Sequence, residues 1–172
     1  EILDYASVQA ESDTCAASNS DVGNGYIYGK ASSETFIRYA SICDLGEGSD
    51  NKEGINFTSV DGAQTDVGYS VENSRIYNGY YGIEANTTAN NSTSSGSIGS
   101  GIRNNAIYGT ESILINFVGS DNELIDGNDL DNGADASYSV FIWDGASGNV
   151  ISENIIHNNT SGIHLVCTAQ FI

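Results

Sequence analysis

The segment Ile102-Arg-Asn-Asn-Ala-Ile107 contains a six-residue pattern: an apolar residue, two variable residues, a small residue or Asn, one variable residue and a second apolar residue. Successive copies begin 34, 34, 31, 23 and 26 residues apart. They occupy Leu3–Val8, Ile37–Ile42, Val71–Ile76, Ile102–Ile107, Ile125–Leu130 and Ile151–Ile156. A second short strand-like segment follows each copy, at Tyr26–Tyr28, Gly54–Phe57, Gly82–Ala85, Ile113–Phe117, Val140–Trp143 and Gly162–Val166.

The spacing of these segments predicts one class of fold. A period of 23 to 34 residues, with two or three short β-branched strands per repeat and turn residues between them, is typical of a β-solenoid. The chain lacks the 3.6-residue periodicity of an amphipathic helix. We therefore expect an all-β chain of about six coils, with residues 1–172 forming one domain. That domain is an excerpt of a longer solenoid or a subunit that continues into another copy.

The later coils resemble a known repeat. Ile151-Ser-Glu-Asn-Ile-Ile156, followed by Asn158-Asn-Thr-Ser-Gly-Ile-His-Leu165, is similar to the repeat of right-handed parallel β-helices. These β-helices are found in polysaccharide-processing enzymes, surface proteins and periplasmic copper-maturation factors. The resemblance covers essentially the whole chain and is strongest from Val71 to Val166. It implies a single-stranded right-handed parallel β-helix, but it does not imply one function.

The fourth position of the pattern predicts a column of stacked side chains. It is occupied by Ala6, Ala40, Ser74, Asn105, Asn128 and Asn154. Stacked coils place these residues in line at steps of about 4.8 Å. We expect Asn105, Asn128 and Asn154 to hydrogen-bond up and down the stack and to tolerate the bend between strands. The alternative is that these amides bind sugar.

The second position of the pattern predicts a column of outward-facing charges. It is occupied by Asp4, Arg38, Glu72, Arg103, Asp126 and Ser152, so the sign alternates over five coils. Opposite charges on adjacent strands stabilise a sheet by roughly 0.2–1 kcal/mol per pair, and a slip of one coil would oppose like charges. We interpret this column as a structural ladder.

Charge and composition exclude several partners. Asp and Glu number 23 against five Lys and Arg, a formal net charge of −18. Because binding to phosphates needs clustered cations, we expect neither nucleic acid nor an anionic membrane as a partner. Apolar runs such as Val140–Trp143 and Leu165–Cys167 are too short for membrane insertion. The chain starts at Glu1 and contains no Met, which favours a processed or excerpted exported chain and an extracellular or cell-surface location.

Few residues suit catalysis. Lyases of this fold need a basic residue, and its hydrolases need clustered Asp residues. The three cations outside the charge column, Lys30, Lys52 and Arg75, lie in polar insertions or in a coil, so we expect no catalytic residues. An enzyme, if present, would be a polysaccharide lyase or hydrolase.

Metal binding has weak candidates. His157 and His164 lie in the last coil, where solvent-facing roles are expected and a metal pair is the alternative. The acidic stretches Asp44–Glu53 and Asp126–Asp131 offer oxygen atoms to Ca²⁺, but neither matches a defined loop. We expect no metal and no cofactor, with Ca²⁺ as the alternative.

Two covalent modifications are indicated. Cys15, Cys43 and Cys167 are disulfide candidates, and their odd number leaves one thiol free, buried or bound to another molecule. The sequence N-x-S/T marks surface glycosylation candidates at Asn56, Asn86, Asn90, Asn91, Asn158 and Asn159.

Three functions compete at this stage. Neither terminus has an evident cap, so open strand edges would pair head to tail and generate a filament or a closed hoop. This favours a self-assembling structural subunit of a sheath, surface layer or filament, and a tubular archaeal sheath is the nearest known type. The alternative is a polysaccharide-binding or polysaccharide-degrading protein, with Tyr side chains and Trp143 as sugar platforms. A metal-delivery role rests on the two His residues alone.

Overall fold

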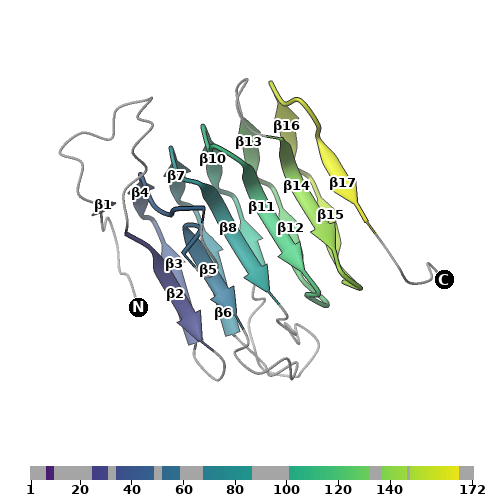
Figure 1. Cartoon of the computed structure of the whole chain (residues 1–172), viewed down its shortest axis with the longest axis horizontal. Coiled ribbons are helices and arrows are strands. Elements are labelled where there is room, and N and C mark those ends of the chain that lie inside the picture. Colours follow the sequence, from purple (N-terminus) through teal and green to yellow (C-terminus); the bar gives the residue numbers. More distant parts are fainter. Residues whose placement is uncertain are drawn as a thin grey trace.

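The computed structural model describes residues 7–9, 25–30, 34–48, 52–58, 68–86, 101–131, 137–146 and 148–166. Every regular element in these ranges is a β-strand, and the strands form three sheets (Figure 1). Sheet A contains β3 (Glu34–Arg38), β6 (Gly68–Glu72), β9 (Gly101–Arg103), β12 (Leu124–Asp126) and β15 (Val150–Ser152). Sheet B contains β1 (Ser7–Gln9), β4 (Ser41–Cys43), β7 (Arg75–Tyr77), β10 (Ala106–Tyr108), β13 (Asp129–Asp131) and β16 (Ile155–His157). Sheet C contains β2 (Ile27–Lys30), β5 (Ile55–Thr58), β8 (Tyr81–Asn86), β11 (Ile113–Val118), β14 (Tyr138–Trp143) and β17 (Ile163–Leu165).

The order of the strands is that of a solenoid. Neighbours within each sheet lie three elements apart in the sequence, and all of them pair in parallel. The chain therefore passes through sheets A, B and C in turn and then returns to A one step along the stack. The predicted all-β, parallel β-solenoid-like architecture is confirmed at this level.

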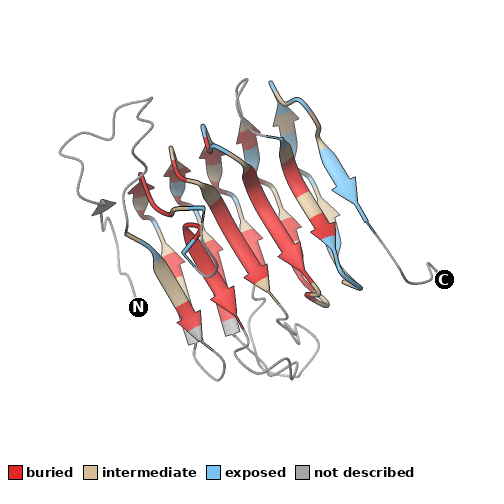
Figure 2. Cartoon of the chain, viewed as in Figure 1, coloured by how far each residue is buried: buried red, intermediate tan, exposed pale blue. Residues whose placement is uncertain are grey.

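The apolar residues of the repeat form the core. In sheet A the first apolar residues stack in register as Ile37, Val71, Ile102, Ile125 and Ile151. In sheet B the second apolar residues stack as Ile42, Ile76, Ile107, Leu130 and Ile156. In sheet C, Ile55, Ile83, Ile115, Val140 and Ile163 complete the third wall. Burial is greatest in the central coils (Figure 2). One copy of the pattern thus supplies two strands, one to sheet A and one to sheet B.

The bend between sheets A and B falls on the third position of the pattern. The residues there have φ near +50° to +65°: Tyr39 (53°), Asn73 (50°), Asn104 (52°), Gly127 (65°) and Glu153 (53°). The residue with the left-handed conformation is therefore the third one, directly before the fourth-position residue that was expected to tolerate the bend. The left-handed conformation turns the chain, and the next side chain then points into the corner.

Glycine before a sheet C strand permits close backbone approach. Gly54 has φ of +146°, and a Cβ atom there would lie 2.3 Å from the carbonyl oxygen of Tyr81 in the next coil. Any larger residue at this position would push the two coils apart.

Candidate functional site

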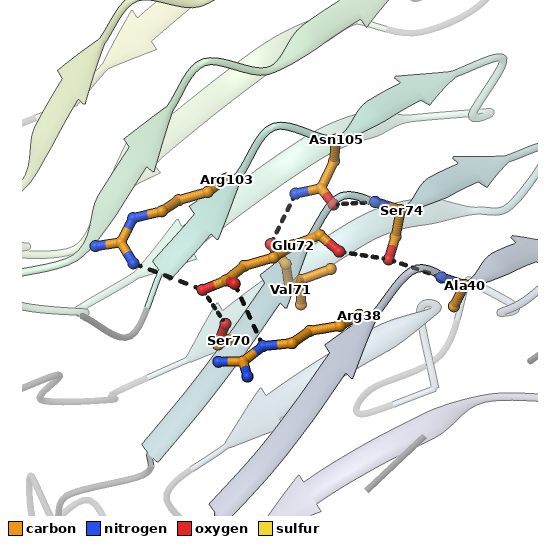
Figure 3. A network of polar contacts seen from close by, with 8 residues as sticks. All are labelled: Arg38, Ala40, Ser70, Val71, Glu72, Ser74, Arg103 and Asn105. Atoms are coloured by element: carbon orange, nitrogen blue, oxygen red, sulfur yellow. Dashed lines mark hydrogen bonds and ion pairs between the residues drawn. The ribbon is translucent and has the colours of Figure 1, made fainter. Parts of the chain in front are cut away.

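The charge column lies on the outer face of sheet A (Figure 3). Arg38 pairs in register with Glu72, and Glu72 pairs with Arg103. Arg38 Nε lies 3.3 Å from Glu72 Oε2, and Arg103 Nη1 lies 3.6 Å from Glu72 Oε1. Farther along, Asp126 is the register partner of Arg103, and Ser152 Oγ lies 2.5 Å from Asp126 Oδ1. Asp4 lies outside the described residues.

Glu72 is therefore the carboxylate that joins two cationic neighbours. Replacing Glu72 by Lys would place three cations in consecutive coils and remove the acceptor of the Ser70 hydroxyl, which lies 2.6 Å from Glu72 Oε1. We expect the free energy of unfolding to fall by about 1–2 kcal/mol, because each partly exposed pair contributes up to about 1 kcal/mol. The loss should shrink at 1 M salt. Urea denaturation measures it, and the exposed Glu111→Lys change is the control for net charge; equal effects of both changes would contradict the column's role.

The fourth-position residues of the pattern lie at the bend between sheets A and B and join it with hydrogen bonds. We call them the corner column: Ala40, Ser74, Asn105, Asn128 and Asn154. Asn105 Oδ1 accepts from the Ser74 backbone N–H at 2.9 Å, and Ser74 Oγ accepts from the Ala40 N–H at 3.1 Å (Figure 3). Asn128 Oδ1 accepts from both the backbone N–H and the Nδ2 of Asn105, each at 3.0 Å. Asn154 Oδ1 does the same for Asn128, at 2.9 Å. These contacts join successive coils, and in the buried coils they occupy the amides that sugar binding would need. Ala6 lies outside the described residues.

A buried carboxyl group lies on the outer face of sheet C, and the sequence reasoning missed it. Asn56, Glu84 and Asn116 are register partners on β5, β8 and β11, and they are 0%, 5% and 3% exposed. Asn56 Nδ2 donates to Glu84 Oε1 at 3.2 Å, and Asn116 Nδ2 donates to Glu84 Oε2 at 3.1 Å. The available signal was the alternation Ile55-Asn-Phe57, Ile83-Glu-Ala85 and Ile115-Asn-Phe117, which aligns three polar residues.

Burial changes the acidity of this group. Burial, followed by the nearby carboxylate of Glu53, raises the pKa of Glu84 to about 7, while the amides of Asn116, Asn56 and Asn86 oppose the rise. Burial and Glu84 also raise the pKa of Tyr81 to about 12. Glu84 is thus an acid that exchanges a proton near neutral pH.

An aromatic cluster extends the same face toward the last coil. Phe141 pairs in register with Asn116 and with His164. Its ring centroid lies 4.9 Å from that of Tyr138, 5.9 Å from Trp143 and 5.2 Å from His164. Trp143 and His164 are exposed. We call Tyr138, Phe141, Trp143 and His164 the aromatic cluster.

The two His residues lie in different sheets. His157 lies on sheet B, with Nε2 2.7 Å from Asp129 Oδ1 and Nδ1 3.7 Å from Asp131 Oδ2. His164 lies on sheet C in the aromatic cluster. They do not form one metal site together, and the part of the chain that the structure describes contains no group of three His, Cys, Asp or Glu side chains able to hold a metal.

The other sequence candidates are dispersed. Lys52 Nζ lies 3.0 Å from Glu47 Oε1 in the first acidic stretch, where burial also raises the pKa of Asp44. Arg75 Nη2 lies 3.1 Å from the Tyr108 hydroxyl on sheet B. Lys30 ends β2 on sheet C, and its side chain lies outside the description. The two described cations, Lys52 and Arg75, thus have different partners.

The modification candidates separate into accessible and inaccessible positions. Cys43 is buried and disulfide-bonded, whereas Cys15 and Cys167 lie outside the described residues. Asn56 is fully buried, with Nδ2 donating to Glu53 and Glu84, so the expected surface sequon is wrong at this position. Asn158 is exposed after β16, and Asn86 and Asn159 are half-buried. Asn90 and Asn91 lie outside the described residues.

Comparison with protein-family models, curated proteins and solved structures found no match for the chain. Within the described ranges, no helix is long and apolar enough to cross a membrane.

Proposed function

We propose that this chain is a right-handed, single-stranded parallel β-helix that works as an extracellular structural subunit and assembles end to end. One observation carries the proposal. Ile163 and Leu165 occupy core-register positions of β17, yet they are 46% and 49% exposed. Among the described residues, no strand pairs with the outer edges of β15, β16 and β17. A parallel coil placed there would bury these side chains and pair their backbone groups.

The use of the polar residues supports a structural role. In the charge column and the corner column, the polar side chains bond to neighbouring coils, as expected of a rigid rod. The disulfide at Cys43 supports an oxidising, extracellular location. Among the described sequons, the exposed Asn158 is the one that we propose for a surface glycan.

The test compares charges on two faces of the last described coil. We expect the protein, with any native flanking sequence, to form concentration-dependent head-to-tail oligomers in sedimentation velocity and filaments or hoops in electron microscopy. The double change Ile163→Lys and Leu165→Lys should abolish them, because it places two cations on the end of the core. The matched control is Ile155→Lys, since Ile155 is 64% exposed but lies on the outer face of sheet B. Monomers at high concentration, or equal effects of both changes, would overturn the proposal.

A second candidate function is polysaccharide binding, and the aromatic cluster favours it. Flat rings on a rigid sheet suit stacking against sugar rings. Trp143 is the single Trp of the chain, so its fluorescence reports occupancy directly. A saturable change in that fluorescence on adding oligosaccharides, with monomers only in sedimentation, would favour this function over assembly.

A further inference from the structure

The outer face of sheet C contains two carboxyl groups that share one donor. Asn56 Nδ2 lies 3.2 Å from Glu53 Oε2 and 3.2 Å from Glu84 Oε1. Both Glu side chains are buried. Two ionised carboxylates held this close repel each other, and one amide cannot neutralise them.

The neighbouring strands supply amide donors to Glu84. On β5, Asn56 faces it, and the Thr58 hydroxyl donates to Asn56 Oδ1. On β8, the titratable neighbour is Tyr81, with Tyr80 next to it; on β11, the neighbour is Asn116. Among the described residues no ion pair reaches Glu84. A proton on Glu84 can therefore relieve its repulsion with Glu53.

Asn116 provides the second half of the site. Its Nδ2 donates to Glu84 Oε2 at 3.1 Å, while its buried Oδ1 has no hydrogen-bond partner. If the amide group turns over, Oδ1 comes to face Glu84 Oε2. Two bare oxygens repel at that distance, but a proton on Oε2 converts the contact into an O–H···O hydrogen bond. The column Asn56–Glu84–Asn116 thus has one arrangement for ionised Glu84 and another for neutral Glu84.

We propose that Glu53 and Glu84 form a shared proton-binding site in which Glu84 takes up a proton at mildly acidic to neutral pH, the Asn116 amide turns over, and the stacking of β5, β8 and β11 becomes more stable. This goes beyond the structural role, because it makes the strength of the stack depend on pH.

The direction of the effect follows from linkage. Folded Glu84 holds its proton up to about pH 7, whereas the ordinary pKa is 4.5. The folded state therefore binds more protons between these values, and its stability falls as the pH rises through this window and stays lower above it. For this group alone, the folding equilibrium constant should drop roughly 300-fold over the whole window, because the pKa differs by about 2.5.

The experiment measures the proton and the stability separately. We expect the side-chain ¹³C resonance of Glu84 in the wild-type protein to titrate near pH 7 and to titrate lower in Glu53→Gln. Urea denaturation gives the folding equilibrium constant of each variant. The ratio of this constant for Glu84→Gln to that for wild type should rise roughly a hundredfold from pH 5 to pH 8. The exposed Glu111→Gln change is the control and should show no such gain.

Three results would overturn the proposal. The first is a Glu84 midpoint near 4.5 in the wild-type protein, which requires no variant to fold. The second is a Glu84→Gln effect that does not depend on pH. The third is an effect of 1 mM Ca²⁺ that lowers the Glu84 midpoint and, at pH 8, stabilises wild type but not Glu84→Gln. Such an effect would mean that the two carboxylates hold a cation and not a proton.

Discussion

Replacing Asn128 by Leu should reduce the free energy of unfolding by roughly 4 kcal/mol, although Leu has nearly the same shape as Asn. Asn128 is buried, and its Oδ1 accepts from the N–H and the Nδ2 of Asn105. Its Nδ2 donates to the Ile102 carbonyl oxygen at 2.9 Å. Leu offers neither function, so a buried N–H and a buried carbonyl lose their partners at roughly 1–3 kcal/mol each. The midpoint and slope of urea denaturation measure the loss.

The matched control is Asn154→Leu in the last described coil. Asn154 makes the same bonds to Asn128 and to the Ile125 carbonyl oxygen, but it is only half-buried. Water can replace part of what is lost, so we expect less than half the effect of Asn128→Leu. Equal losses at both positions, or a loss under about 1 kcal/mol at Asn128, would mean that the ladder does not hold the corners together.

The repeat made the core predictable. The first and last residues of each pattern are apolar at a fixed separation, so stacking them in register needed no more than the period. The second position follows an inward-facing apolar residue, so its side chains were likewise expected to face outward. These features depend on residues that recur in every coil, and each coil is therefore independent evidence for the same column.

The bend was harder to locate. The left-handed residues at the third position share no residue type. Asn and Gly, found at Asn73, Asn104 and Gly127, are common in that conformation, but Tyr and Glu, found at Tyr39 and Glu153, are not. The fourth position does have a shared type, small residues or Asn, and for that reason the sequence associated it with the bend. Its small and Asn side chains are instead selected by the narrow corner and by the donors that line it.

The carboxyl pair escaped prediction for a different reason. Outward positions of a solenoid sheet usually meet solvent, and polar residues such as Asn56 and Glu84 fit that expectation. Their burial depends on what covers sheet C, and the repeat does not encode it. The pairing of Tyr69 with Glu123 is similar, since these residues lie 54 positions apart and belong to no common column.

Replacing Tyr69 by Ala should cost about 5 kcal/mol, the largest single loss we expect. Tyr69 on β6 is fully buried, and its ring stacks on Phe57 with centroids 4.2 Å apart. Removing a buried aromatic ring costs roughly 3–5 kcal/mol through lost transfer energy and a cavity. The phenol also donates to the buried Glu123 Oε2 at 2.6 Å. Burial, together with Glu123, raises the pKa of Tyr69 well above its usual value, so the phenol stays neutral and remains a donor.

Tyr69→Phe separates the hydrogen bond from the ring. The stacking on Phe57 is retained, so the expected loss of about 2 kcal/mol reports the bond to a charged acceptor. Glu123 is also held at its backbone N–H, which donates to Asn149 Oδ1 at 2.7 Å, so its carboxylate has little freedom to seek water. A double-mutant cycle with Glu123→Leu then tests the pair directly. If Tyr69 and Glu123 stabilise each other, the double variant loses less than the sum of the single losses by about 2 kcal/mol. Additive losses would mean that Tyr69 contributes through packing alone, and the loss for Tyr69→Ala should then fall to that of an ordinary buried ring.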